Sequence, residues 1–501
     1  MGASSTRAIS PHVREEAGEA EQAFEELVSW MRSKQTRSLP LHEVERSEEA
    51  QIREVARRLL QEHINTRGHG AVGHALKRAE GQRLTEPRLR ERSYVSIFGQ
   101  GQIHRLAYGA AGVRSILPLD EQMNLPERSY SYELQKRVTR QGALGPFEAA
   151  QETIEEWSGV GVPKRMVEVL AIDAAQDVEG FYAHKTPSPG TPTGPILVCA
   201  ADGKGVPIRK ARPRQGGRRR KKGEKPEVKK MATVAAVYTT APYPRTPEEI
   251  VREVHREAPP AQPPPRPRPE HKRVWASLKK DKDEMFGEIA AEMAKRDPSR
   301  RKTWTFLCDG ELALQQRALA VLKPLGATFY VILDLFHVLE YLWKAAYAFH
   351  PEGSQEAEQW VTAHLLGLLH GRVSRVAAGL RQSATKLKLR GQKRQAVDTA
   401  AHYFLKNKAF MRYDEYLTLG LPIGSGAAEG ACRNLIKDRM ERTGMRWTVD
   451  GAEAVIQLRA TDLSSDWEEY WHYHIEAERR RLYPENAWRP AKTKPLLRRV
   501  S

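Results

Sequence analysis

Hydrophobic positions in the first 190 residues recur with the period of a helix. Apolar side chains fall every three or four residues between residues 19 and 60, which is the spacing of one face of an α-helix. Two more helical patterns span residues 147–178, joined by a glycine-containing turn at residues 158–161, and Pro163 is suited to open the second helix. We expect an all-α N-terminal region over residues 1–145 and a helix-turn-helix-like element over residues 146–190.

The pattern changes at Gly194 to short runs rich in β-branched residues. Three such runs follow one another between residues 194 and 241, which is typical of an antiparallel meander. Two more strand patterns, residues 303–310 and 327–334, alternate with three helical patterns, the last starting near His337. Meander, helix, strand, helix, strand, helix is the order of the ribonuclease-H-like fold. The sequence therefore predicts an α/β class with a mixed sheet.

Residues 347–419 contain helical patterns and no strand pattern, and a glycine-rich turn after Gly420 opens an amphipathic helix. We therefore expect the ribonuclease-H-like mixed sheet to occupy residues 191–346 and 420–463, interrupted by an all-helical insertion over residues 347–419. A basic C-terminal tail is expected over residues 464–501.

Two unusual segments fall inside a predicted loop at residues 209–272. Nine basic residues lie between Arg209 and Lys222, a density that cannot pack into a core. Residues 258–269 contain seven prolines, which favours a stiff, extended linker. We expect the basic segment to add affinity for a polyanion without reading its sequence.

Charge and composition limit the class of partner. The 81 Lys and Arg residues exceed the 63 Asp and Glu residues by 18, an excess used most often to bind nucleic acid or an acidic membrane. The three cysteines lie about a hundred residues apart, which excludes a disulfide framework or zinc ribbon and favours a reducing cytoplasm. No signal peptide and no membrane-spanning run is expected.

Three acidic residues are candidates for chemistry. Asp202 and Asp309 each end a predicted strand and precede a glycine. If the two strands are neighbours, their carboxylates meet at one edge of the sheet and repel unless a divalent cation lies between them. Glu429 enters at the first turn of the helix after the glycine-rich block. The alternatives are ordinary turn chemistry for the aspartates and a helix-dipole acid paired with Arg433 for Glu429.

Asp334 is a second candidate for the middle acid. It ends the fifth predicted strand and lies three residues before His337, so a carboxylate and an imidazole share one end of the sheet. The pair fits a metal ligand, a partner of a ligand, or an N-cap for the following helix. We prefer Asp309, because its strand is expected directly beside that of Asp202.

Four segments resemble the Kra-type bacterial insertion-sequence transposases, which are DDE enzymes distantly similar to the Mutator-like group. They are VCAADGKGVPI at 198–208, FLCDGELAL at 306–314, LDLFHVLEYLWKAAYAF at 333–349 and LPIGSGAAEGACRNLIKDRMERTGMRW at 421–447. The resemblance implies that Asp202, Asp309 and Glu429 are the catalytic acids and hold two Mg²⁺ or Mn²⁺ ions. Asp334 and His337 match an auxiliary C/D-x-x-H signature.

The same resemblance implies a function and partners. The N-terminal region, with its helix-turn-helix-like DNA-binding element, would bind the terminal inverted repeats of the element. The chain would then cleave and join DNA strands by two-metal phosphoryl transfer. Double-stranded DNA is the expected partner, with a homodimer or larger assembly on it, in the bacterial cytoplasm at the nucleoid. A structure-specific nuclease and an idle DNA-binding regulator are the alternatives. The cations expected to contact DNA are Lys164, Arg165, Arg218, Arg219, Arg220, Lys221, Lys222, Arg433 and Arg439.

Overall fold

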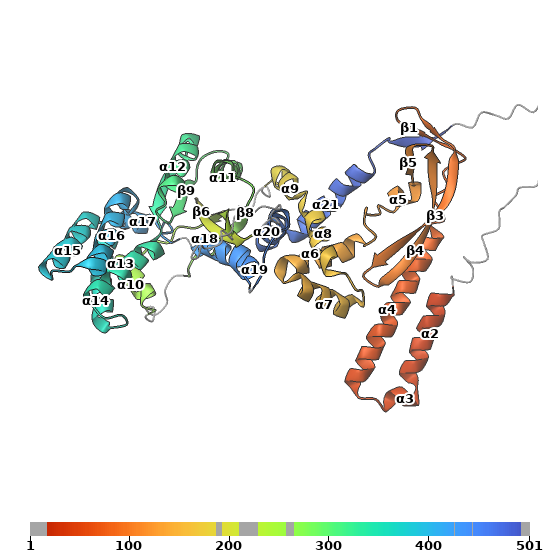
Figure 1. Cartoon of the computed structure of the whole chain (residues 1–501), viewed down its shortest axis with the longest axis horizontal. Coiled ribbons are helices and arrows are strands. Elements are labelled where there is room, and N and C mark those ends of the chain that lie inside the picture. Colours follow the sequence, from red (N-terminus) through yellow and green to blue (C-terminus); the bar gives the residue numbers. More distant parts are fainter. Residues whose placement is uncertain are drawn as a thin grey trace, which may run out of the picture. The chain divides into compact units, whose positions relative to one another are not determined.

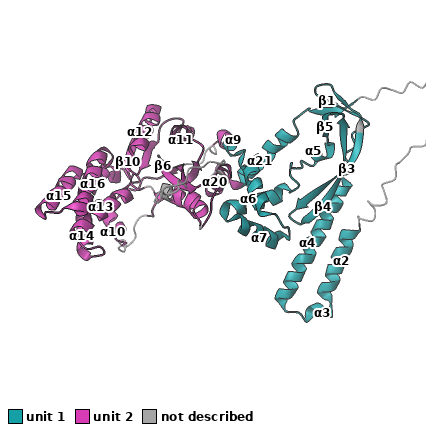
Figure 2. Cartoon of the chain, in the orientation of Figure 1, with its two compact units in different colours: residues 1–181, 468–501 teal, residues 182–467 magenta. Residues whose placement is uncertain are grey.

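The computed structural model describes residues 18–186, 193–209, 229–256, 265–424, 426–442 and 444–491, without the side chains of Glu86 and residues 427–429. The chain divides into two units (Figure 2). Unit 1 contains residues 1–181 and 468–501, and unit 2 contains residues 182–467. Among the described residues, the helices are too short or too polar to cross a membrane.

Unit 1 begins with the helices that the periodicity predicts (Figure 1). The long helices α2 (Glu19–Arg32) and α4 (Leu41–Thr66) pack directly against each other. A short helix, α3 (Lys34–Arg37), connects them. Leu27 on α2 and Val55 on α4 are buried, while the polar positions of both helices face solvent. The pair is thus held by one apolar stripe on each helix.

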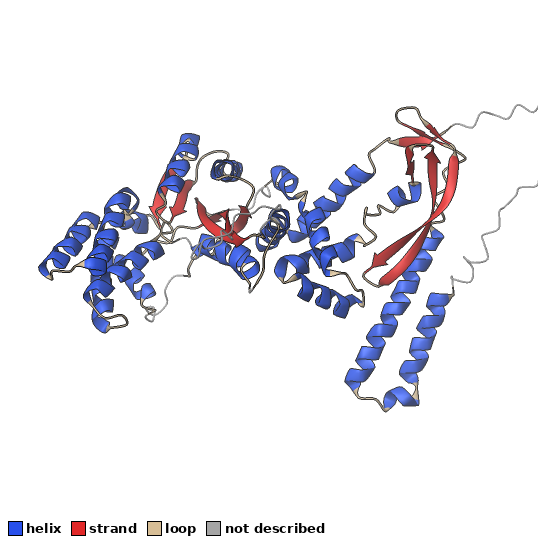
Figure 3. Cartoon of the chain, viewed as in Figure 1, coloured by secondary structure: helices blue, strands red, loops and turns tan. Residues whose placement is uncertain are grey.

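The prediction of an all-α N-terminal region is wrong, as the strands in Figure 3 show. A three-stranded antiparallel sheet is built from β3 (Glu86–Ser96), β4 (Gly99–Ala110) and β5 (Val113–Ile116). Ile103 of β4 is fully buried in a cluster with Ile64 and Leu119, so apolar packing on one face holds this sheet. Strand β3 has an arginine at every second position over part of its length, at Arg88, Arg90 and Arg92. It therefore lacks the apolar run by which the other strands were predicted.

A helical cluster follows the sheet and contains the predicted helix-turn-helix-like element. Helix α7 (Phe147–Ser158) ends at Gly159, whose φ of 64° is left-handed, and α8 (Lys164–Ala175) begins after Pro163. Apolar residues of α6, α7 and α8, among them Val138, Ile154 and Val167, form one core. The predicted pair of helices is confirmed as local structure. The other helices of this region are α5 (Pro118–Gln122), α6 (Tyr132–Leu144) and α9 (Val178–His184).

The expected basic C-terminal tail is largely folded, which corrects the prediction for residues 464–501. Residues 467–482 form α21 (Trp467–Leu482), on which Tyr470, Trp471 and His474 are buried. Strand β11 (Trp488–Pro490) joins β1 (Leu76–Arg78) and β2 (Arg83–Leu84) in a second three-stranded sheet. The segment therefore folds because aromatic side chains on one face of α21 are buried, although its composition predicted a basic tail.

Unit 2 contains a five-stranded mixed sheet in the order β10-β9-β6-β7-β8. Strands β6, β9 and β10 are parallel, and β7 runs antiparallel to both β6 and β8. The α/β class and the mixed sheet are as predicted. The strands are β6 (Ile196–Pro207), β7 (Lys229–Thr240), β8 (Glu270–Ser277), β9 (Thr303–Cys308) and β10 (Thr328–Leu333).

Two details of the sheet differ from the expected meander. The first two predicted strands are one strand, β6, because Gly203 and Gly205 stay paired with β7 throughout its length. The third strand in chain order within this sheet, β8, was not predicted, since it starts with Glu270, His271 and Lys272 and buries only its last four residues. The third predicted run is confirmed as strand β7, and the predicted loop 209–272 is therefore wrong over residues 229–240.

Helices cover both faces of the sheet. The ring of Phe286 on α11 (Lys282–Arg296) lies 5.6 Å from that of Phe306 on β9, which places α11 on one face. Helix α18 (Gly426–Ala431) contacts β6 and β7, and continues into a π-helical segment (Cys432–Lys437), α19 (Asp438–Met440) and α20 (Val449–Leu463).

The predicted helical insertion is present, and its helices gather beside the β10 edge (Figure 2). Tyr413 and Tyr416 are buried and donate hydrogen bonds to Leu333 O and Val331 O of β10, which ties the insertion to the sheet. The remaining helices of unit 2 are α10 (Pro247–Val254), α12 (Leu312–Val321), α13 (Leu335–Phe349), α14 (Gln355–Leu369), α15 (Val373–Lys386), α16 (Gly391–Asn407) and α17 (Tyr413–Thr418), with 3-10 turns at Lys323–Leu325 and Lys408–Phe410.

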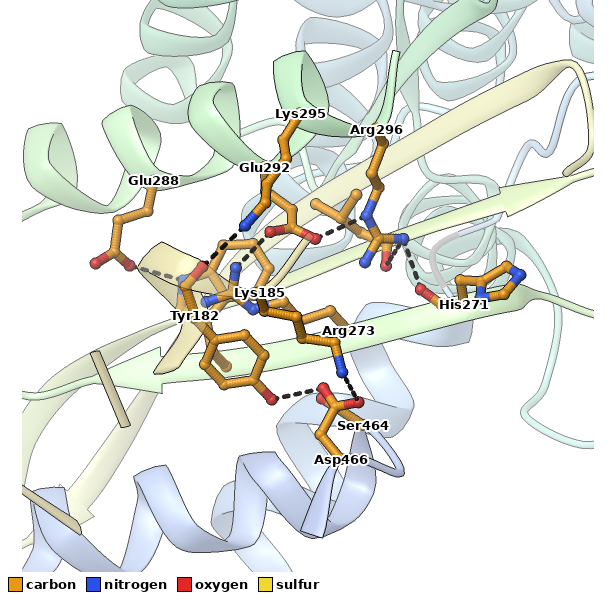
Figure 4. A network of polar contacts seen from close by, with 12 residues as sticks. Tyr182, Lys185, His271, Arg273, Glu288, Glu292, Lys295, Arg296, Ser464 and Asp466 are labelled. Atoms are coloured by element: carbon orange, nitrogen blue, oxygen red, sulfur yellow. Dashed lines mark hydrogen bonds and ion pairs between the residues drawn. The ribbon is translucent and has the colours of Figure 1, made fainter. Parts of the chain in front are cut away.

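A network of ion pairs and rings fixes β8 to α11 (Figure 4). The Arg273 guanidinium lies 3.8 Å from the Tyr182 ring centroid and 4.5 Å from that of Trp275. Its Nη1 donates to Glu292 Oε2 at 2.5 Å, and Arg296 Nε donates to the other oxygen of Glu292 at 2.7 Å. One carboxylate thus forms ion pairs with two guanidinium groups that are largely removed from water.

Candidate functional site

Three aspartates occupy equivalent register positions on the three parallel strands: Asp202 lies within β6, and Asp309 and Asp334 directly follow β9 and β10. Ala200 of β6 pairs with Leu307 of β9, and Leu333 of β10 pairs with Cys308. If the pairing is extended by two residues from Ala200 and by one residue from Leu333, Asp202, Asp309 and Asp334 lie side by side in one row. Neighbouring strands of a sheet are about 4.8 Å apart. The strand of Asp309 lies directly beside that of Asp202, as the sequence analysis predicted, and the strand of Asp334 lies one position further out.

The register also assigns a face to the row. Side chains alternate along a strand, so Phe306 points toward α11 and Asp309 lies on the opposite face. Asp202 lies on that opposite face too, because Cys432 Sγ of the π-helical segment contacts Asp202 Oδ2 at 3.1 Å. The face that carries α18 is therefore the face of the carboxylates.

Asp202 and Asp309 are partly exposed and held by local hydrogen bonds. Asp202 Oδ1 accepts from Gly203 N at 2.6 Å, and Asp309 Oδ1 accepts from Glu311 N at 2.8 Å. Tyr403, from the helical insertion, donates to the Asp309 carbonyl oxygen at 2.6 Å. Both carboxylates are oriented by their own backbone and remain accessible at the end of the sheet.

Asp334 differs from the other two aspartates in burial. It has no exposed surface, and its Oδ1 accepts from Phe336 N at 2.6 Å, which makes it the N-cap of α13. The helix-capping interpretation is thereby confirmed. His337 follows on the first turn of α13, and its buried Nδ1 has no hydrogen-bond partner within the described part of the chain. A buried cap is less suited to binding an ion from solution than the accessible Asp309.

Glu429 lies on α18, which contacts both β6 and β7, although its side chain is outside the described residues. Its backbone thus comes to the sheet that carries Asp202. Among the side chains that the structure describes, no group of three or more His, Cys, Asp and Glu residues is arranged to hold a metal ion. This statement does not include Glu429, because its side chain lies outside the described residues.

The cations predicted to contact DNA have different environments. Lys164 and Arg165 are exposed at the start of α8, where Lys164 Nζ lies 3.5 Å from Glu148 Oε2. Arg433 is exposed on the π-helical segment. The five cations Arg218, Arg219, Arg220, Lys221 and Lys222 lie outside the described residues.

Arg439 does not fit the predicted DNA contact. It is fully buried, and its guanidinium lies 4.6 Å from the ring centroid of Trp447. Burial, together with the nearby charges of Arg459 and Arg442, lowers the pKa of Arg439 to about 9. As placed, this side chain supports the packing around α19 and cannot reach a phosphate.

Two partners of the aspartates were missed by the sequence analysis. Cys432 was considered only for disulfides, yet its position three residues after Glu429 puts it on the helical segment that faces Asp202. Tyr403 lies 94 residues beyond Asp309 in the chain, and nothing local in the sequence indicates that the insertion reaches back to this strand end.

Comparison with known proteins identifies no family. No protein-family model and no curated protein matches the chain. Among solved structures, a chain of the Drosophila P element transposase strand transfer complex is similar with a TM-score of 0.27 and 9% sequence identity. The match covers 70% of this chain and 81% of that chain. This TM-score is too low to show a shared fold.

Proposed function

We propose that the chain is a DNA transposase of the Kra-type group, which uses Asp202, Asp309 and Glu429 for metal-dependent cleavage and joining of DNA strands. The row of aspartates across the parallel strands is the observation that carries the proposal. Because β6 and β9 are neighbours, two accessible carboxylates share one face at one edge of the sheet. The four segments that resemble this group contribute all of these residues.

The sheet supports assigning a ribonuclease-H-like fold to unit 2. When the strands β6 to β10 are numbered 1 to 5 in chain order, their order across the sheet is 3-2-1-4-5. Only strand 2, which is β7, runs antiparallel to its two neighbours. In this proposal Asp202 belongs to the central strand and Asp309 to the next parallel one. Helix α18 brings Glu429 to the same sheet from a segment more than a hundred residues later.

The donor atoms suit a hard divalent cation. Carboxylate oxygens are the ligands that Mg²⁺ and Mn²⁺ prefer, and Asp309 Oδ2 makes no hydrogen bond within the described residues. Asp202 Oδ2 would exchange its contact with Cys432 for the ion. Two ions held by Asp202, Asp309 and Glu429 would supply the Lewis acidity that activates a water or 3′-hydroxyl and stabilises the leaving oxygen.

Charge on the helical insertion supports DNA as the partner. Residues 371–397 contain eight Lys and Arg residues and no acidic residue. Four of these cations are exposed around the turn between α15 and α16, and none of the four has an ion pair within the described chain. The first turn of α16 has no acidic residue to balance the helix dipole. We call these four residues the insertion tip: Lys386, Lys388, Arg390 and Lys393.

Neutralising the insertion tip by four Gln substitutions should weaken binding to all duplex DNA alike. Each lost phosphate contact reduces the slope of log K against log salt concentration by about 0.9. The loss of four contacts should therefore reduce this slope by up to about 3.6. Fluorescence anisotropy at several salt concentrations measures this slope. A matched control removes four cations that have acidic partners, Lys279, Arg317, Lys344 and Arg412, and should change the slope less. Equal effects of both sets would exclude the tip as a DNA contact.

A strand-transfer assay tests the proposed function. The purified chain is incubated with a duplex carrying the ends of its own element, a target plasmid and Mg²⁺. We expect cleavage at the element ends and joining to the plasmid, with neither product in EDTA. Nicking without joining would favour the structure-specific nuclease, and binding without either product would favour a DNA-binding regulator.

A further inference from the structure

A cavity of about 980 Å³ lies in unit 2, next to the residues that follow Asp334, and none of the three aspartates lines it. Its wall includes Leu335 and Phe336, which directly follow Asp334, and Gly424 and Gly426 at the start of α18. Five Arg or Lys side chains and two Glu side chains line it, so the cavity is positively charged overall. It is distinct from the carboxylates that the proposed reaction uses.

One of the lining cations, Arg245, is buried with little compensation. Only 8% of its side chain is exposed, its Nη1 lies 3.8 Å from Glu253 Oε2, and its Nη2 lies 3.5 Å from the Leu421 carbonyl oxygen. Its buried Nε has no hydrogen-bond partner among the described residues. The Tyr243 ring lies 5.3 Å from the guanidinium carbon and completes these contacts. A buried guanidinium whose ion pair is long and whose Nε has no partner favours an anionic ligand, because a buried charge needs close partners.

Backbone hydrogen bonds hold Arg245 rigidly at the cavity. Arg245 N donates to Leu417 O at 3.2 Å, and Tyr243 N donates to Gly420 O at 2.9 Å. Gly420 has a φ of +68°, and a Cβ atom there would lie 2.5 Å from Tyr243 N, so only glycine permits this approach. The position of the arginine is therefore built into the fold.

An aromatic ring lies on the same wall. Phe336 is 51% exposed, unusual for a phenylalanine within a helix whose other apolar residues are largely buried. A Cβ atom at Gly424 would lie only 3.0 Å from Cε2 of Phe336, so the glycine leaves room for the ring at this place. The cavity thus presents a planar apolar surface together with a guanidinium.

We propose that this cavity binds one nucleotide, with its phosphate on Arg245 and its base against Phe336. Guanidinium groups pair with phosphate, and bases stack on aromatic side chains without regard to sequence. On the proposed function, the nucleotide is an unpaired residue at the end of a DNA strand that enters the aspartate row. A free nucleoside phosphate has the same chemistry and is the other source of ligand.

Equilibrium binding of tailed and blunt DNA tests this inference. Full-length protein is titrated, without divalent metal, against a labelled 30-base-pair duplex with a blunt end and the same duplex with a four-nucleotide single-stranded tail. The wild type should prefer the tailed duplex, and Phe336→Ala should remove about tenfold of the affinity for the tail while binding the blunt duplex normally. Phe24→Ala is the matched control, because Phe24 is also 51% exposed and lies in unit 1.

Arg245→Gln is a second variant, which removes the proposed phosphate contact. It should reduce the slope of log K against log salt concentration for the tailed duplex by about 0.7. Deoxynucleoside monophosphate and triphosphate are added as competitors. Competition at micromolar concentration, lost in Phe336→Ala, assigns the cavity to a free nucleotide, whereas no competition assigns it to the strand end. Equal binding of tailed and blunt DNA by wild type and Phe336→Ala, without any nucleotide binding, overturns the inference. Absence of all DNA binding would instead contradict the proposed function.

Discussion

Replacing Asp202, Asp309 or Glu429 by Ala is expected to abolish metal-dependent DNA cleavage, with losses of roughly a thousandfold or more. Each change removes an ion ligand in the proposed site and leaves every phosphate-binding cation in place. DNA affinity should therefore stay nearly unchanged. Binding and nicking are measured on one preparation of each variant, so that loss of folding is separated from loss of chemistry.

Asp334→Asn is the control for the choice of the second acid. Asn caps a helix about as well as Asp, so α13 should keep its N-cap, and cleavage should survive. If Asp334→Asn is inactive while Asp309→Ala still cuts DNA, the second acid is Asp334 and the proposed assignment is wrong. The burial of Asp334 and the accessibility of Asp309 favour the first result.

Glu292→Ala should destabilise unit 2 by about 3–5 kcal/mol, because it leaves Arg273 and Arg296 buried without their shared carboxylate. Among the described residues, no other carboxylate forms an ion pair with both guanidinium groups, and Figure 4 draws the two pairs of Glu292. Urea denaturation followed by tryptophan fluorescence measures the effect, since Trp275 and Trp304 lie in this unit. Glu340→Ala removes an exposed pair with Lys344 and should change stability by less than about 0.5 kcal/mol. Equal losses in both variants would contradict the expected role of burial.

The same carboxylate predicts a pH dependence. Burial opposes ionisation of Glu292, but Arg273 and Arg296 outweigh it, so its pKa lies below the ordinary value of 4.5. A lowered pKa means that the stabilisation is complete above about pH 4.5 and is lost as the pH falls through the lowered value. The difference in stability between wild type and Glu292→Gln should therefore narrow below pH 4.5.

The sequence predicted those elements whose signal is local. Strands β9 and β10 are apolar runs bounded by turn residues, and α11, α12 and α13 have a helical period and lie where they were expected. The adjacency of the strands carrying Asp202 and Asp309 followed from the order of elements. Each of these strands and helices has its pattern within about fifteen residues, whereas the adjacency of the two strands rests on the order of elements along the chain.

Elements that depend on distant partners were missed. Strand β8 has a charged first half and gains its stability from β7 and α20. The sheet of unit 1 is hidden by the arginines of β3, and α21 was missed because the burial of Tyr470 and Trp471 depends on the folded unit. The cavity at Arg245 could not be predicted either, because segments near residues 245, 336 and 424 meet there only in the fold.

Anomalous diffraction from crystals of the full chain bound to a DNA end and soaked in Mn²⁺ tests the central claim most directly. The measurement locates bound ions without relying on activity. We predict two anomalous peaks, both beside the middle of β6 and the carboxyl end of β9, within ligand distance of Asp202 and Asp309 and with Glu429 on one of them. Peaks at Asp334 alone, or none at the aspartate row, would contradict it.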